Sequence, residues 1–183
     1  IKQYVLRSEV IAYVYPVKLE IQEEFENEVG RWIREGLLQK FKEKCKGVVL
    51  LMAVFQHSKG KVRPVMDFRE LNKYVSSHSA TSDICNEKLR KWCQMGTNLC
   101  IIDLKDAYLQ LHVSRELWKY QVVRYKGKVY ALTRLGFGLN VAPKIMSAVV
   151  KFVLSSDPKI REATDSYVDD IVADLNKVSR RDV

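Results

Sequence analysis

Three aspartates stand where short apolar segments end, and they restrict the folds that this chain can adopt. Asp103 directly follows the apolar letters LCII, and Asp169 and Asp170 separate segments 166–168 and 171–173. A carboxylate beside a buried strand is costly unless its charge is matched, and adjacent carboxylates repel each other. The last two segments predict a tight β-hairpin with the aspartate pair at its tip. If Leu99–Asp103 is a strand next to this hairpin, all three carboxylates converge.

Converging carboxylates suit divalent cations, because Mg²⁺ prefers hard oxygen ligands. Two ions about 3.5–4 Å apart could share the three side chains and promote phosphoryl transfer. One ion would activate the attacking oxygen and the other would stabilise the leaving oxygen. The alternative is a solvated hairpin tip that binds no metal, since Asp is a favoured turn residue.

The remaining segments predict an α+β fold. Apolar residues at four-residue steps predict a helix over residues 19–44, and the continuous apolar run 48–55 predicts a strand covered on both faces. Pro64 places the next strand, VRPVMDF, at an edge or bulge. Residues 86–95 predict a second helix, and 118–125 with 128–133 predict a basic hairpin around Lys126-Gly127. A last helix is expected to begin at Pro143, carry apolar residues along one side, and close at Asp157-Pro158.

The charge of the chain indicates its class of partner. Its 183 residues include 31 Lys and Arg against 22 Asp and Glu, a net charge of +9. Basic residues concentrate within residues 59–73 and 115–134, and four aromatic residues are interleaved with the second cluster. Such a pattern suits a phosphate backbone with stacking surfaces, although a solvated basic face is the plainer alternative. An acidic metal centre in a basic chain favours a nucleic acid or nucleotide substrate.

The sequence gives less support to a membrane protein, a secreted protein or a zinc-binding protein. No apolar run approaches the roughly 20 residues of a membrane helix, and the first residues lack the parts of a signal peptide. We therefore expect an intracellular, cytoplasmic or nuclear protein with no membrane partner. The four cysteines and three histidines are scattered without the spacing of a zinc site. The absence of an initiating Met suggests a fragment.

Four segments, taken in order, resemble the reverse transcriptase family of long-terminal-repeat retroelements and retroviruses. KVRPVMDFRELN is similar to its fingers segment, IIDLKDAYLQL to its first catalytic motif, RLGFGLNVAPKIM to its nucleotide-and-template motif, and SYVDDIV to its Tyr-x-Asp-Asp motif. A Tyr-x-Asp-Asp match alone is weak, but the ordered set of four is specific. The resemblance covers about residues 36–174.

The resemblance implies roles for the matching acidic and aromatic residues. Asp103, Asp169 and Asp170 would be catalytic and would bind two Mg²⁺ ions, for which Mn²⁺ can substitute. Tyr108, five residues after Asp103, would exclude the 2′-hydroxyl of a ribonucleotide. The alternative is that Tyr108 is simply a tyrosine of the hydrophobic core. The backbone at Asp106 and Ala107 would face the triphosphate.

It also implies roles for basic residues and for the loop of the third segment. Arg63 would bind the β- and γ-phosphates. Lys59 or Lys61 would help, and both are candidates because they lie in or beside the same short turn. Phe137 and Gly138 would contact the incoming nucleotide or template. Gly136 stands where the family has Pro and is expected to loosen this turn. The predicted nucleic-acid track consists of Arg69, Arg124, Lys126, Lys128, Pro143 and Tyr167.

The resemblance implies a polymerase right-hand fold with an antiparallel palm sheet and no thumb. Fingers would comprise residues 1–96 and 111–141, and the palm would comprise 97–110 and 142–183. The expected function is RNA-directed DNA synthesis with dNTPs on a primed RNA or DNA template. Thumb, RNase H and integrase segments of a parent polyprotein are expected downstream. The alternatives are a domesticated, catalytically inactive nucleic-acid-binding remnant and an RNA-templated RNA polymerase, against which Tyr108 argues.

Overall fold

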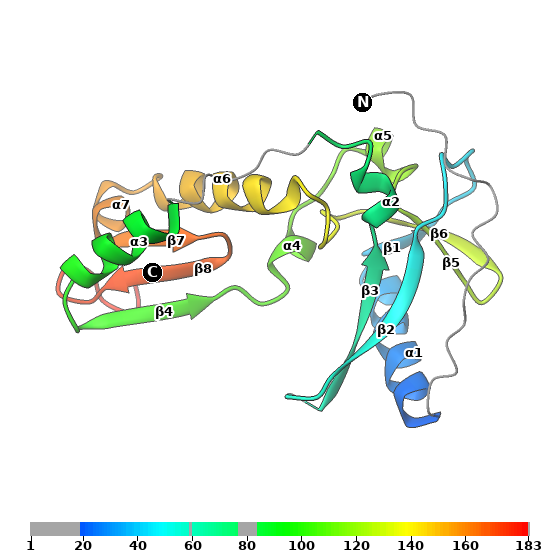
Figure 1. Ribbon diagram of the computed structural model, residues 1–183, viewed down its shortest axis with the longest axis horizontal. Coiled ribbons are helices and arrows are strands. Elements are labelled where there is room, and N and C mark those ends of the chain that lie inside the picture. The colour runs from blue at the N-terminus through cyan, green and yellow to red at the C-terminus, as the bar shows by residue number, and fades with distance from the viewer. Residues whose placement is uncertain (1–18, 59, 77–83, 183) are drawn as a thin grey trace. The chain divides into compact units, whose positions relative to one another are not determined.

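The computed structural model of the chain describes residues 19–58, 60–76 and 84–182 (Figure 1). The chain divides into two compact units, one made of residues 1–76 and 108–140 and the other of 77–107 and 141–183. Helices and antiparallel sheets alternate irregularly in both units. The expected α+β class is therefore confirmed. Among the described residues, no helix combines the length and apolar character needed to cross a membrane.

The first unit begins with α1 (Leu19–Arg34), which is shorter than the helix predicted over residues 19–44. Gly36, with a φ of +73°, takes the left-handed conformation that ends many helices, and its N–H donates to the carbonyl of Ile33 (N···O 3.2 Å). The chain then enters β1 (Leu38–Lys40), where Leu38 is 1% exposed. The prediction was wrong beyond Arg34 because helical periodicity cannot show that Leu38 pairs with a distant strand.

β2 (Leu50–Gln56) and β3 (Lys61–Asp67) form a two-stranded antiparallel sheet against which α1 packs. Ala53 lies opposite Pro64, so the predicted edge position of this proline is confirmed. The prediction that β2 is covered on both faces was wrong. Val54 and Phe55 are 41% and 36% exposed, because the sheet has only two strands and α1 covers part of it.

β5 (Val122–Tyr125) and β6 (Lys128–Leu132) form the predicted hairpin, and β1 adds to β6 to give the strand order β1-β6-β5. Lys126 and Gly127 make its two-residue turn with φ values of +46° and +72°, as a type I′ turn requires. Trp118 was wrongly predicted to begin the first strand. It ends the short helix α5 (Arg115–Trp118), and its indole N–H donates to the carbonyl of Val113 (3.1 Å).

The core of the first unit joins α1, the two sheets and α2 (Arg69–Asn72). Val29 and Val123 are fully buried, and Phe68 is 2% exposed. This core draws on residues from both stretches of sequence that make up the unit, so neither stretch buries its apolar side chains alone. Its buried members are Val29, Trp32, Leu37, Leu38, Val49, Met66, Phe68, Leu71, Val123, Tyr130 and Leu132.

The second unit is a three-stranded antiparallel sheet in the order β4-β8-β7, accompanied by three helices (Figure 1). Its strands are β4 (Leu99–Asp103), β7 (Thr164–Tyr167) and β8 (Asp170–Asp174). Its helices are α3 (Ile84–Gln94), α6 (Ala142–Leu154) and α7 (Pro158–Ala163). The sequence correctly predicted β4 and a tight hairpin of β7 and β8. The aspartate pair is not its tip, however: Asp170 pairs with Tyr167 as the first residue of β8, so Val168 and Asp169 form the turn.

α6 begins as expected, with Pro143 in its first turn. Its expected apolar side is only partly buried: Met146 and Val150 face the core, whereas Ile145 and Val153 are 41% and 59% exposed. Asp157 does not close α6, which ends three residues earlier. Its carboxylate instead begins α7 by accepting from the backbone N–H of Lys159 and Ile160.

Asp165 on β7 is a buried carboxylate that ties α3 to the sheet. Its side chain accepts a hydrogen bond from the Lys88 ammonium and another from the indole N–H of Trp92 (2.9 Å), and Lys91 lies 3.5 Å away. Burial by itself raises the pKa of Asp165, but the hydrogen bonds of Lys88 and Trp92 and the charge of Lys91 outweigh it, so the net pKa is lowered.

This lowered pKa predicts an acid-dependent contribution to stability. Asp165 favours the folded chain above its unfolded pKa of about 3.9, and the contribution is lost as pH falls through the lower folded value. We expect Asp165→Asn to cost about 1–3 kcal/mol of unfolding free energy at neutral pH. The difference from the unmodified chain should shrink below about pH 4. Urea unfolding of both proteins between pH 7 and pH 3 measures it, and a difference independent of pH would contradict the assignment.

Candidate active site

The three candidate catalytic aspartates lie at one end of the β4-β8-β7 sheet of the second unit. β4 and β8 pair so that Asp103 is directly opposite Asp170. Tyr167 pairs with Asp170 across the β7–β8 hairpin, which leaves Val168 and Asp169 as its two-residue turn. The backbone register therefore brings Asp103 and Asp170 together, with Asp169 adjacent in sequence.

The turn that carries Asp169 is strained. Val168 has a φ of +57°, a conformation that is a genuine outlier for a β-branched residue. Such conformations cost about 1–3 kcal/mol and persist only where surrounding structure holds them, often at functional sites. Here the pairing of Tyr167 with Asp170 and of Asp170 with Asp103 holds the turn on both sides.

We therefore expect Val168→Gly to stabilise the second unit by about 1 kcal/mol, because glycine adopts positive φ without steric cost. Chemical unfolding measures the change. The matched control is Val172→Gly, at a buried position in the middle of β8, which should destabilise the chain through lost packing and added backbone freedom. Destabilisation at both positions would show that Val168 carries no strain.

The aspartates combine hard oxygen donors with uncompensated charge. Asp103 and Asp170 are exposed and Asp169 is half-buried, and no ion pair or hydrogen bond joins their side chains to another described residue. No three or more His, Cys, Asp or Glu side chains form a ready metal-holding group within the described part of the chain. The fit to a divalent cation thus rests on the donor chemistry and on the register of β4 with β8.

The first unit carries two aromatic residues that the resemblance singled out. Tyr108, in the short helix α4 (Ala107–Gln110), is 9% exposed, and its ring meets that of Phe137 edge to face with centroids 5.3 Å apart. Phe137 is 64% exposed. The structure thus brings together two of the residues that the resemblance singled out. Asp106, with a φ of +50°, and the buried Ala107 directly precede Tyr108 in the sequence but belong to the second unit.

Two amide side chains hold the loop that carries Phe137. Asn72 donates to the carbonyl of Gly138 (2.8 Å) and accepts from the N–H of Asn140 (2.9 Å). Gln121, 3% exposed, donates to the carbonyl of Arg134 (3.0 Å) and accepts from the N–H of Gly136 (3.1 Å). Sequence reasoning missed both amides, because each acts on backbone far along the chain. The only local signal was a polar residue, Gln121, directly before the apolar start of a strand.

Gly136 does not loosen this loop, contrary to expectation. It is buried, and a Cβ atom there would lie 2.4 Å from Cζ of Phe68 and 2.6 Å from Oε1 of Gln121. Space rather than flexibility therefore requires glycine at this position. Gly138 differs, since its φ of +100° is one that side-chain-bearing residues rarely adopt.

The predicted phosphate-binding residues fall into two groups. Lys61 and Arg63 are exposed at alternate positions of β3. Neither these two side chains nor those of Arg124 and Lys128 form an ion pair with another described residue. Lys59 lies outside the described residues.

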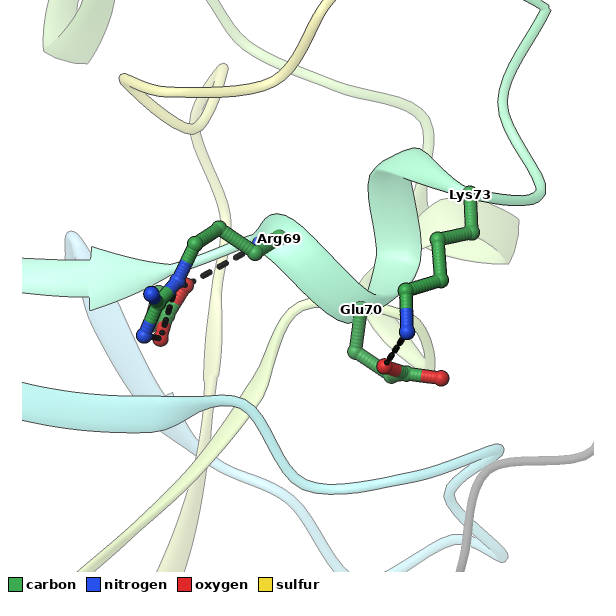
Figure 2. A network of polar contacts seen from close by, with 4 residues as sticks. Arg69, Glu70 and Lys73 are labelled. Carbon is green, nitrogen blue, oxygen red and sulfur yellow. Dashed lines mark hydrogen bonds and ion pairs between the residues drawn. The ribbon is translucent and has the colours of Figure 1, made fainter.

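Arg69 and Lys126 are instead engaged with carboxylates. Arg69 forms a two-pronged ion pair with Asp67, whose shortest N···O distance is 2.6 Å, and these hydrogen bonds lower the pKa of Asp67. Lys73, directly after α2, pairs with Glu70 in that helix (Figure 2). Lys126 pairs with Glu26 at 2.6 Å. In the second unit, Pro143 is exposed and Tyr167 is 41% exposed.

No protein-family model matches this chain. A protein of Caenorhabditis elegans, itself described as uncharacterized, is 25% identical over 172 residues, which are 91% of this chain and 13% of that protein. The native protease–reverse transcriptase of prototype foamy virus superposes with a TM-score of 0.64 at 21% identity, over 86% of this chain and 20% of the viral one. The foamy viral enzyme solved in complex with double-stranded DNA gives a TM-score of 0.68 at 22% identity, over 87% and 32%. The chain thus spans less than a third of these proteins and shares the fold of part of the foamy viral protease–reverse transcriptase.

Proposed function

We propose that the chain is part of the RNA-directed DNA polymerase of a retroelement, which adds deoxynucleotides to a primer 3′-hydroxyl. The pairing of β4 with β8 carries this proposal, because it sets Asp103 opposite Asp170 and beside the strained turn that holds Asp169. Support comes from the fold, which resembles that of foamy viral protease–reverse transcriptase, and from the ordered sequence motifs.

In this proposal Asp103, Asp169 and Asp170 hold two Mg²⁺ ions, or Mn²⁺ in their place. Bound metal would lower the pKa of the primer hydroxyl and neutralise the triphosphate. Lys61 and Arg63 project from alternate positions of β3, which lie on one face of a strand, and would bind the triphosphate oxygens. The Arg63 guanidinium can donate two parallel hydrogen bonds, whereas Lys61 acts as a point charge.

The aromatic pair and the basic surface would position the other reactants. Tyr108 excludes a 2′-hydroxyl, and Phe137 offers a face to a nucleobase. A primed RNA or DNA template would contact Arg69, Arg124, Lys126, Lys128, Pro143 and Tyr167. Thumb, RNase H and integrase segments of a longer polyprotein are the proposed companions of this chain.

We assign the first unit to the fingers and the second to the palm of a polymerase. The compact units differ from the predicted ranges at three places. Residues 108–110 group with the first unit instead of the palm, and residue 141 groups with the second unit instead of the fingers. The largest difference is residues 77–96, which group with the second unit rather than with the fingers. Within the described part, the reason is the bonding of Lys88 and Trp92 on α3 to Asp165 on β7. The apolar periodicity of α3 could not reveal this attachment.

Single-nucleotide addition tests the proposal without requiring processive synthesis. The chain, in excess over a labelled primer on an RNA template, is mixed with one dNTP or the matching rNTP and Mg²⁺ or Mn²⁺. We expect extension by one deoxynucleotide, dependent on the metal. Failure to extend with either metal would overturn the proposal, and equal use of rNTPs would favour an RNA polymerase.

A second candidate function is nucleic-acid binding without catalysis, as in a domesticated remnant. It is favoured by the lack of a ready metal-holding group among the described residues. A working metal site binds the folded chain and so raises its melting temperature as ion concentration rises. A melting temperature unaffected by Mg²⁺ and Mn²⁺, with oligonucleotide binding intact, would favour this second function.

A further inference from the structure

The side chain of Gln121 is built into the loop that carries Phe137. Its amide donates to the carbonyl of Arg134 and accepts from the N–H of Gly136, and its own backbone carbonyl accepts from the N–H of Leu132 (2.9 Å). A buried amide whose two ends are both bonded is held in one orientation, because leaving either end unpaired costs free energy. Gln121 therefore fixes the path of residues 132–136.

Gln121, Phe68 and Gly136 fill one another's space. The position that a Cβ of Gly136 would take lies within 2.6 Å of both the Phe68 ring and Oε1 of Gln121, and both of these side chains are at least 97% buried. The two side chains already fill the space beside Gly136, so the loop backbone has no room to move toward the core. Packing against Phe68 and Gln121 therefore fixes the loop on its core side, in addition to the hydrogen bonds.

The residue next to this fixed point is an exposed ring. Phe137 follows Gly136 directly, is 64% exposed, and touches Tyr108 edge to face. An exposed phenylalanine on a mobile loop would fold onto nearby apolar surface, whereas here the backbone before it is anchored by Gln121. The backbone after it is anchored by Asn72, which bonds the carbonyl of Gly138.

We propose that Gln121 is a positioning residue that holds Phe137 in the orientation in which its ring stacks on a nucleobase. This inference rests on the proposed function, which supplies the nucleobase. Gln121 is only 3% exposed and acts through its hydrogen bond with Gly136. Stacking on aromatic side chains is a common and sequence-tolerant source of affinity for single strands, and the +9 net charge of the chain supplies phosphate attraction.

The test is binding of a fluorescently labelled single-stranded RNA to the full chain, measured by anisotropy across a range of salt concentrations. Phe137→Ala should weaken binding about tenfold and Gln121→Leu about fivefold. Neither should change the slope of log affinity against log salt, because that slope counts phosphate contacts. Lys128→Gln, on the same unit, should lower the slope. Gln39→Leu, the same replacement at an exposed position of β1, should leave binding unchanged.

Combining the variants separates positioning from an independent contact. If Gln121 acts through the ring, Phe137→Ala with Gln121→Leu should bind no more weakly than Phe137→Ala alone. The inference would be overturned if the double variant weakened binding by the product of the two single effects. It would also be overturned if Gln121→Leu altered the salt slope or bound with the affinity of the unmodified chain. An unchanged affinity of Phe137→Ala would also overturn the inference, but it would leave the proposed function intact. Absence of RNA binding by the unmodified chain would instead overturn the proposed function and this inference together.

A measurement on the unmodified chain covers the case in which Gln121 variants do not fold. The N–H of Gly136 should be strongly protected from hydrogen exchange, since it donates to a buried amide. Exchange at the rate of an exposed loop would overturn the proposal. Gln121→Asn, which keeps the amide but shortens its reach, gives a milder second variant with the same expected binding signature.

Discussion

Replacing Asp169 by asparagine should slow single-nucleotide addition by at least about a hundredfold while nucleic-acid binding survives. The change removes one negative oxygen donor from the proposed metal site. Metal-borne stabilisation of the transition state amounts to several kcal/mol, and about 3 kcal/mol corresponds to a hundredfold in rate. Affinity should fall little, because the proposed phosphate contacts come from Lys and Arg. Rates are measured under single-turnover conditions, and affinity by anisotropy with the same primer–template.

Asp182→Asn is the matched control in the same unit. It makes the same change of charge at an exposed carboxylate whose partners are the backbone N–H of Ser179 and the ammonium of Lys159. Its rate should stay within about twofold of the unmodified chain. Unchanged nucleotide addition by Asp169→Asn would show that the carboxylate at the hairpin turn is not part of the catalytic site.

Replacing Tyr108 by valine should allow ribonucleotides to be incorporated. The tyrosine ring is buried against Phe137, and in the proposed function its edge leaves no space for a 2′-hydroxyl. Exclusion of this kind is steric, so a smaller side chain relaxes it without touching the aspartates. The ratio of kcat/KM for a dNTP to that for the matching rNTP should fall by well over tenfold.

Tyr108→Phe is the control, since it keeps the ring and removes only the hydroxyl. Its dNTP-to-rNTP ratio should stay within about threefold of the original, a difference of roughly 0.6 kcal/mol. If the valine variant stays within the same limit, Tyr108 is a core tyrosine and not a gate. A fall in both dNTP and rNTP rates by equal factors would likewise contradict the steric interpretation.

The segments that sequence reasoning predicted well are those whose signals are local. β4 and the β7–β8 hairpin follow from short apolar runs that end at charged turn residues, and Pro143 marks the start of α6 through its fixed φ. The sequence predicted that Asp103 and Asp170 converge only if β4 lies next to the hairpin, and the register of β4 with β8 fulfils that condition. The metal they are proposed to bind remains a prediction.

The features that could not be predicted depend on partners far along the chain. α1 ends at Arg34 because Leu38 pairs with Leu132, and no local pattern reports that pairing. Gly136 was interpreted from the flexibility of glycine, whereas its actual constraint is the Phe68 ring and the Gln121 amide. Composition alone makes Gln121 an ordinary polar residue, and only the fold shows that both of its ends bond backbone.

Because each unit is made from two separate stretches of chain, synthesis on the ribosome imposes an order on the carboxylate site. β1, β2, β3, β5 and β6 are all translated before α6, so the first unit can close while the second is incomplete. β4 leaves the ribosome early but stays without its partner until β8 follows much later. A pause within residues 141–163 would therefore prolong the time during which β4 is unpaired, and a premature stop there would release a chain with a finished first unit and an unpaired β4. An exposed strand edge of this kind recruits other chains, so translation speed over α6 and α7 bears directly on how much of the protein reaches its native pairing.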